Sequence, residues 1–152
     1  MDTDKIARWR TAVDDFLATN PKPGDIITEE WKQEHFGLPR PRLGTLEAVR
    51  SYQLKMLTAF DCFSKELLTE HQIHLKSGGR GAHIVIPPEN QTKEAWNDGV
   101  NEISRSLRKA KLRLEHVDLG GLDTDHRKEN TDAKTRLAMI SSMFRKVKKQ
   151  SI

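Results

Sequence analysis

Helical spacing of apolar residues predicts three helices in the first half of the chain. Apolar side chains three or four residues apart form one stripe over about residues 4–19 and another from Thr45 to about Glu70, and a shorter stripe follows Thr28. Pro21 ends the first helix, because proline cannot continue the hydrogen-bond ladder. The residues expected to face the core are Ile6, Trp9, Val13, Phe16, Leu17, Trp31, Phe36, Val49, Tyr52, Met56, Phe60, Phe63 and Leu67.

Short apolar and β-branched segments predict a small amount of β-structure beside these helices. Asp25–Ile27 is long enough for a brief strand, and Gln72–Lys76 and His83–Pro87 flank a glycine-rich stretch, which is typical of a β-hairpin. Pro87-Pro88 closes the hairpin, so we expect a first domain over residues 1–88.

The most regular apolar pattern lies in the last third of the chain. The stripes Trp96–Leu114 and His126–Val147 each alternate steps of four and three residues, and Gly120-Gly121 separates them. If the chain folds back at Gly120, facing residues have numbers that sum to 240, so that Ile103 faces Leu137 and Leu107 faces Ala133.

Two stripes in mirror register predict an antiparallel helical hairpin over residues 89–152. His126 and Asn130 would then lie in the seam and set the register. The expected fold class is mainly α with a small β-hairpin: a first module of helices and strands, then the helical hairpin.

Charge separates the two parts of the chain. Of 26 Lys and Arg and 22 Asp and Glu, residues 1–91 hold 12 and 13, and residues 92–152 hold 14 and 9, so the basic excess is C-terminal. No apolar run approaches the roughly 20 residues of a membrane span, and the polar N-terminus lacks a signal-peptide pattern. A single cysteine, Cys62, suits a reducing compartment, and we expect a buried, inert thiol in a cytoplasmic protein without membrane contact.

The N-terminal order of elements (helix, strand, helix, helix, hairpin) resembles that of a winged helix-turn-helix protein. The likeness is closest at Leu67–Leu75 followed by Arg80–Val85, which is similar to a third helix that runs into a wing. Winged-helix wings commonly place an aromatic residue after Arg-Gly-x, whereas Ala82 and His83 stand here. The chain also resembles small uncharacterised prophage-encoded proteins through Gly24–Trp31 and Pro87–Thr92, which implies a phage setting.

The winged-helix resemblance implies DNA contacts from the third helix, through Arg50 and Lys55, and from the wing, through Arg80. Acidic residues on the same helix leave that face with few cations for phosphate. A scaffold or protein-docking surface is therefore the alternative for this module.

Two basic clusters mark the predicted helical hairpin: Arg105, Arg108, Lys109, Lys111 and Arg113, then Arg145, Lys146, Lys148 and Lys149. In the predicted register their centres lie about 20 Å apart along the axis, at 1.5 Å of rise per residue. Such patches can hold a phosphate backbone or an acidic protein surface, or they simply keep the helices solvated.

The sequence offers little for catalysis. His71, His74 and His83 lack a fourth ligand for tetrahedral zinc, so no metal is predicted. Gly78–Gly81 lacks the Lys-Ser/Thr of a nucleotide-binding loop, and no nucleophile–base set stands out. We expect a protein that is not an enzyme and has no cofactor.

The leading interpretation is a regulatory protein of phage type that binds DNA. The alternative is an inhibitor or adaptor that docks on a host protein complex through the helical hairpin. A homodimer would be one way to cover apolar residues such as Met139, Met143 and Ile152.

Overall fold

The computed structural model describes residues 3–42 and 44–150, with side chains from residue 8 onward. The chain divides into two compact units, Met1–Gln91 and Thr92–Ile152. Ile6 and Ile152, named above, have side chains outside the described part. None of the helices described is long and apolar enough to cross a membrane.

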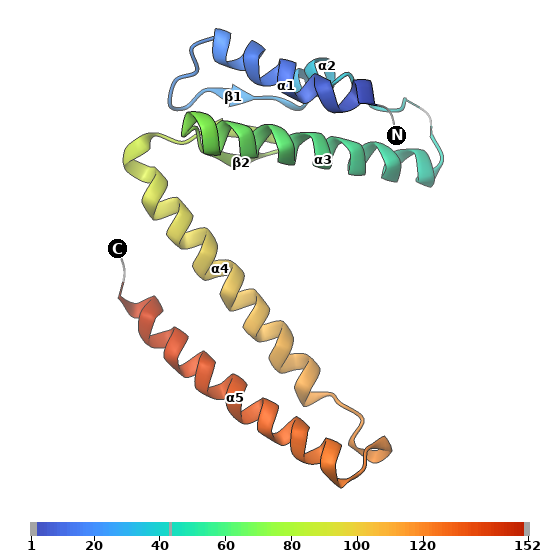
Figure 1. Cartoon of the computed structure of the whole chain (residues 1–152), viewed down its shortest axis with the longest axis vertical. Coiled ribbons are helices and arrows are strands. Elements are labelled where there is room, and N and C mark those ends of the chain that lie inside the picture. Colours follow the sequence, from blue (N-terminus) through green and yellow to red (C-terminus); the bar gives the residue numbers. More distant parts are fainter. Residues whose placement is uncertain (1–2, 43, 151–152) are drawn as a thin grey trace. The chain divides into compact units, whose positions relative to one another are not determined.

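Most of the chain is helical, and a small sheet accompanies the helices of the first unit (Figure 1). This confirms the predicted fold class. The elements are α1 (Thr3–Ala18), β1 (Ile26–Ile27), α2 (Glu29–Phe36), α3 (Leu46–His71), β2 (Leu75–Gly79), β3 (Ala82–Val85), α4 (Pro88–Glu115), the 3₁₀ helix η1 (Leu119–Gly121) and α5 (Thr124–Lys149).

The sheet has three antiparallel strands in the order β1-β3-β2. Strand β1 pairs with β3 at Ile26 and Ile84, which places the predicted brief strand at the edge of the hairpin. Strand β2 begins three residues later than predicted, because Gln72 ends α3 with a φ of 54° and Ile73 still donates a hydrogen bond to the Leu67 carbonyl. The end of the helix therefore occupies the residues that were expected to start the strand.

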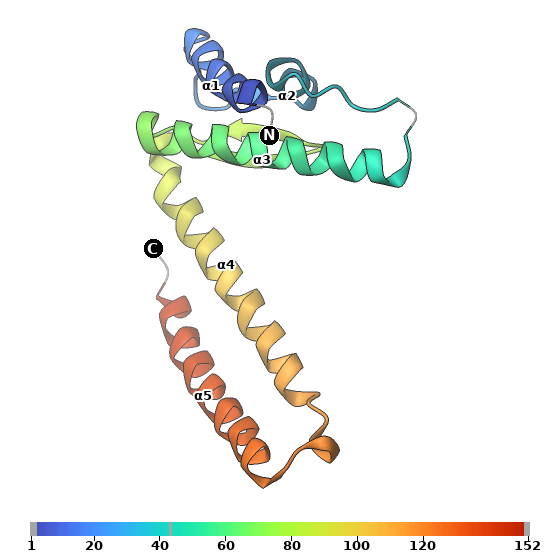
Figure 2. The same ribbon diagram turned by 45° about the vertical axis from the view of Figure 1, so that its right-hand side comes forward.

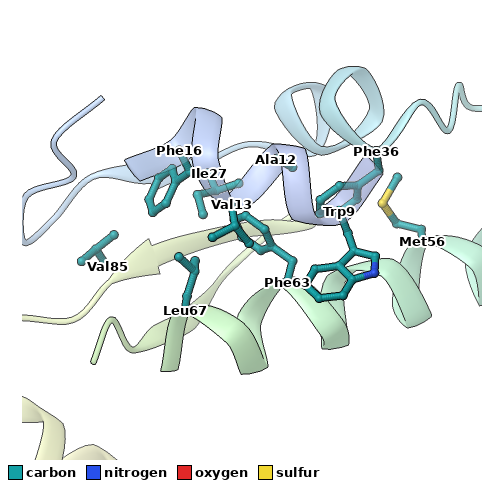
Figure 3. Packing of buried hydrophobic residues seen from close by; sticks show 10 residues of the cluster. All are labelled: Trp9, Ala12, Val13, Phe16, Ile27, Phe36, Met56, Phe63, Leu67 and Val85. Carbon is teal, nitrogen blue, oxygen red and sulfur yellow. The ribbon is translucent and has the colours of Figure 1, made fainter. Parts of the chain in front are cut away.

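Three phenylalanines form the centre of the first core, which lies between α1, α2, α3 and the sheet (Figure 3). The ring centroid of Phe63 lies 6.0 Å from that of Phe16 and 5.5 Å from that of Phe36, both in edge-to-face geometry. Ile27 and Val85 close the core from the sheet. The sequence pattern had assigned all of these residues to the core or to a strand.

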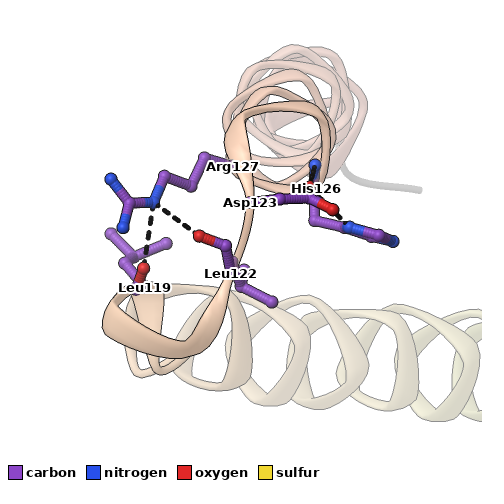
Figure 4. Close-up of polar contacts among 5 residues, drawn as sticks. All are labelled: Leu119, Leu122, Asp123, His126 and Arg127. Carbon is purple, nitrogen blue, oxygen red and sulfur yellow. Dashed lines mark hydrogen bonds and ion pairs between the residues drawn. The ribbon is translucent and has the colours of Figure 1, made fainter.

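In the second unit, α4 and α5 run antiparallel in both views (Figures 1 and 2). Hydrogen bonds fix the turn that joins them: the Arg127 Nε donates to the Leu119 carbonyl at 3.0 Å and to the Leu122 carbonyl at 3.1 Å (Figure 4). Asp123 caps α5, because its Oδ1 accepts from the backbone N–H of His126 at 2.9 Å.

The predicted register of this helical hairpin is wrong. Leu107 lies in a groove with Ser141 and Phe144 rather than opposite Ala133. Ile103 and Ile140, both expected in the seam, are 46% and 52% exposed. The turn explains the difference: α5 begins beyond the end of α4 (Figures 1 and 2), which shifts the facing residues along both helices.

The two polar residues expected in the seam have different surroundings. Asn130 is buried, and its Oδ1 accepts no hydrogen bond from the residues described. His126 is exposed and interacts with Asp123 through Nδ1 at 2.7 Å, so it does not lie in the seam.

Candidate nucleic-acid interface

An open groove of about 710 Å³ lies between the two long helices of the second unit. Five of its lining side chains are cationic, and none of the described residues that line it is acidic. The groove is lined by Asn101, Ser104, Arg105, Leu107, Arg108 and Lys111 from α4 and by Ser141, Phe144, Arg145 and Lys148 from α5.

Helical spacing places these cations on the facing sides of the two helices. Arg105, Arg108 and Lys111 recur every three residues on α4, and Arg145 and Lys148 do so on α5. Each helix also carries a serine four residues before a groove arginine. The Nε of Arg108 donates to the Ser104 carbonyl at 3.4 Å, and that of Arg145 donates to the Ser141 carbonyl at 3.4 Å. These bonds hold the base of each guanidinium against its own helix.

The structure corrects the prediction of two separate basic patches. Arg105, Arg108 and Lys111 come from the first cluster and Arg145 and Lys148 from the second, yet all line the same groove. The changed register is the cause, because it moves the end of α5 along α4. Like charges gathered in one concave surface repel each other and attract anions, so the groove favours a ligand with several negative charges.

The side chains of the groove have the chemistry to bind an anion. Guanidinium groups match the geometry of phosphate oxygens. Leu107 and Phe144 add apolar surface between the cations, where the sugar of a nucleotide could make contact. No His, Cys, Asp or Glu is among the lining residues described.

The remaining cations of the two clusters lie outside this groove. Lys109 lines a separate depression on α4 together with Arg105, Asp98 and Glu102, where acidic neighbours reduce the positive potential. The residues of the clusters that do not line the groove are Lys109, Arg113, Lys146 and Lys149.

Arg80 lies at the tip of the β2–β3 hairpin, in a two-residue turn with Gly81. Both residues have positive φ, 52° and 75°, which is the pattern of a type I′ turn. A Cβ atom at Gly81 would lie 2.5 Å from Oε2 of Glu29, so a larger residue would displace that carboxylate, and the positive φ also favours glycine. Arginine is unfavourable at positive φ, and its presence at an exposed turn suggests a role outside the fold.

The two predicted contacts on α3 have surroundings unlike the groove. Arg50 lies between Leu46 and Leu54 on an exposed face. Lys55 is exposed on another side of the helix. The structure brings neither residue together with the other predicted cations within the first unit.

A partly buried charge cluster beside the β2–β3 hairpin was not predicted from the sequence pattern. The Nζ of Lys32 lies 2.8 Å from Oε2 of Glu29, and the Tyr52 hydroxyl donates to Oε1 of Glu29 at 3.0 Å. Burial tends to raise the pKa of Glu29, but the hydrogen bonds from Lys32 and Tyr52 and the charge of Lys32 outweigh it, so its pKa is lowered. The pKa of Tyr52 is raised by burial and by Glu29.

His83 of β3 lies against the same cluster. Its ring centroid is 3.9 Å from that of Phe60, and its Nδ1 is buried without a hydrogen-bond partner among the residues described. Burial, and then the charge of Lys32, lower the pKa of His83. We found no group of three or more potential metal ligands in the described part of the chain.

Comparisons with protein-family models, with curated proteins and with solved structures found no match to this chain.

Proposed function

We propose that the chain is a non-enzymatic DNA-binding protein of regulatory type whose main phosphate contact is the groove between α4 and α5. The single observation that carries this proposal is the set of five cations in a groove without an acidic lining residue. Arg80, at the tip of the β2–β3 hairpin, is the second proposed contact. Arg50 lies on an apolar face of α3 and is not one of the proposed DNA contacts.

Duplex DNA matches the charge of the groove. The five cations extend over a few helical turns, so a ligand of the groove must present several negative charges over that length. A phosphate backbone does so continuously, and each neutralised phosphate releases counterions and strengthens binding at low salt. The winged-helix-like order of elements in the first unit supports the same class of ligand. Its β2–β3 hairpin would contact the backbone or the minor groove through Arg80.

The test is the salt dependence of duplex binding by the whole chain, measured by fluorescence anisotropy on a labelled duplex of about 20 base pairs. The variant Arg108→Gln/Arg145→Gln removes one groove cation from each helix. If each of them contacts a phosphate, the slope of log affinity against log salt becomes shallower by about 1.8, at about 0.9 per contact.

A matched control changes the adjacent residue on each helix. Lys109→Gln/Lys146→Gln carries the same change in net charge outside the groove, and we expect a nearly unchanged slope. Equal loss of slope in both variants would show that only the overall charge matters. Absence of duplex binding by the unaltered chain at low salt would refute the proposal.

A second candidate function is docking on an acidic protein surface. The observation that favours it is the row of exposed apolar residues on α5, namely Met139, Ile140, Met143 and Val147. Apolar side chains beside cations are typical of protein interfaces. Met139→Ser/Met143→Ser would then reduce capture of a partner from nuclease-treated lysate, whereas DNA binding through the groove would be unaffected.

A further inference from the structure

Helix α3 has a second apolar face, distinct from the one that builds the core. Leu54 and Leu57 lie near its middle and are 66% and 59% exposed. Leu46 and Leu68 lie on the same face toward its two ends and are also exposed. Large apolar residues that follow one another at helical spacing and remain open to solvent mark an interaction surface.

Charged residues stand in this stripe in a regular arrangement. Arg50 lies one turn before Leu54, and Asp61 lies one turn after Leu57. Glu47 and Lys65 flank the stripe another turn outward on the same side of the helix. All four charged residues are exposed, and none forms an ion pair with another residue of the described part.

We propose that this stripe, Leu46–Leu68, pairs with the same stripe of a second copy of the chain. The two α3 helices run antiparallel across a two-fold axis, so that facing residues have numbers that sum to 111. Leu54 then meets Leu57 of the second copy, and Arg50 meets Asp61 of the second copy. Such self-complementarity is the requirement for a closed two-fold interface.

The outer charges lie one residue off this register. Glu47 faces Ser64 of the second copy and lies beside Lys65 of that copy, which adds a weaker attraction at each end of the helix pair. A parallel pair would instead place Arg50 against Arg50 and Asp61 against Asp61. The charge pattern therefore selects the antiparallel orientation, as charged flanking positions do in coiled coils.

This dimer is independent of the proposed DNA binding. The stripe lies on α3 of the first unit, whereas the groove lies between α4 and α5 of the second. Loss of duplex binding in a groove variant thus leaves the dimer intact, and loss of the dimer leaves the groove intact.

The first experiment is sedimentation velocity of the whole chain from about 1 to about 200 μM. We expect a reversible monomer–dimer equilibrium. Leu54→Asp/Leu57→Asp places charge in the centre of the interface and should raise the dimer dissociation constant more than about 30-fold. Circular dichroism checks that this variant stays folded, which we expect because both leucines face solvent. A monomer at all concentrations, or a dimer that persists in the folded variant, would overturn the proposal.

A charge exchange tests the register itself. Arg50→Asp and Asp61→Arg each place like charges opposite one another at two points of the homodimer, and each should weaken it about tenfold or more. The double variant Arg50→Asp/Asp61→Arg restores both pairs and should dimerise again. A mixture of the two single variants should form a heterodimer for the same reason.

Lys55→Asp serves as the matched control, because Lys55 is exposed on α3 but lies off the stripe. It should leave the dimer dissociation constant nearly unchanged. If the double variant fails to regain the dimer while both single variants remain folded, the antiparallel register is wrong.

Discussion

The Nζ of Lys32 lies 2.8 Å from Oε2 of Glu29, and Lys32 is only 4% exposed. The ammonium also lies 5.0 Å from the centroid of the Phe60 ring. A lysine is rarely buried to this extent unless its charge is compensated. Glu29 supplies that compensation from the first turn of α2, and its other carboxylate oxygen holds Tyr52 of α3. One carboxylate thus links α2 to α3 and neutralises a buried cation.

Removal of this carboxylate should destabilise the first unit. Glu29→Gln leaves the Lys32 ammonium buried without its counter-charge, so the free energy of unfolding should fall by about 2–4 kcal/mol. Denaturant unfolding followed by tryptophan fluorescence measures the loss. The adjacent exposed Glu30 provides the control: Glu30→Gln should change stability by less than about 0.5 kcal/mol. An equal effect of both substitutions would contradict the role of the pair.

Lys32→Met should be much less harmful than Glu29→Gln. The methionine fills similar space without a buried charge, and the remaining carboxylate is partly exposed and can be solvated. We therefore expect a loss below about 1.5 kcal/mol in the same unfolding experiment. A larger loss than that of Glu29→Gln would show that the ammonium stabilises the fold beyond its pairing with Glu29.

Stability should depend on pH through His83. Its folded pKa lies below the unfolded value of about 6.5, so the unfolded state binds more protons once the pH falls below about 6.5. The contribution of His83 to the free energy of unfolding is therefore fully present above that pH, and it decreases as the pH falls toward the folded pKa. His83→Gln should therefore flatten the plot of unfolding free energy against pH between about 7 and 5.

Glu29 acts in a different pH range, which separates the two effects. Its pKa is lowered in the folded state, so its contribution is present above its unfolded pKa and is lost only as the pH falls below about 4.5. A slope between pH 7 and 5 that is unchanged in His83→Gln would exclude His83 as the cause.

Substitution of Arg80 should have opposite effects on the stability of the protein and on its affinity for duplex DNA. Arg80→Asn places a residue that tolerates positive φ at the first turn position, next to Gly81. The melting temperature should rise, with a gain of about 0.5–1 kcal/mol. Duplex affinity should fall at the same time, because a cation is lost. Unchanged affinity would remove Arg80 from the proposed contacts, whatever the effect on stability.

Substitution of Asp123, in the turn between α4 and α5, should lower the stability of the second unit. Asp123→Ala removes the side chain that caps α5 and should destabilise the second unit by about 1 kcal/mol. Thermal unfolding followed by the fluorescence of Trp96, with the two other tryptophans replaced by phenylalanine, reports on this unit. Asp125→Ala, in the same helical turn, serves as the control. An equal effect of both would show that only the charge near the helix start matters.

Helix positions could be predicted from the sequence because they follow from local pattern. The stripe Met56–Leu67 and the start at Thr45 predicted α3 correctly. A core-facing stripe and an N-cap such as Thr45 are both properties of neighbouring residues. The strand β2 was misplaced by three residues. Its start depends on how α3 ends, and the positive φ of Gln72 is not visible in the pattern.

The groove could not be predicted, because it depends on a long-range register. Any slide of α5 along α4 by one heptad keeps apolar residues facing each other, so the two stripes alone fit more than one alignment. The turn from Val117 to Asp123 decides between them, through contacts such as those of Arg127 with Leu119 and Leu122. The repeated Ser-x3-Arg spacing at Ser104 and Ser141 was the available signal that these segments are alike.

The sparse burial between α4 and α5 has a consequence for how the second unit melts. Val100 and Asn130 are its buried residues among those described, so its own apolar contacts contribute little to folding. A polyanion that binds only the folded form would stabilise it by mass action, by about 2.7 kcal/mol at a concentration of 100 times its dissociation constant. Calorimetry should then show a broad, weak transition for this unit alone that sharpens and moves to higher temperature as duplex is added. The concentration of its ligand, more than its core, would set the temperature at which the helical hairpin is lost.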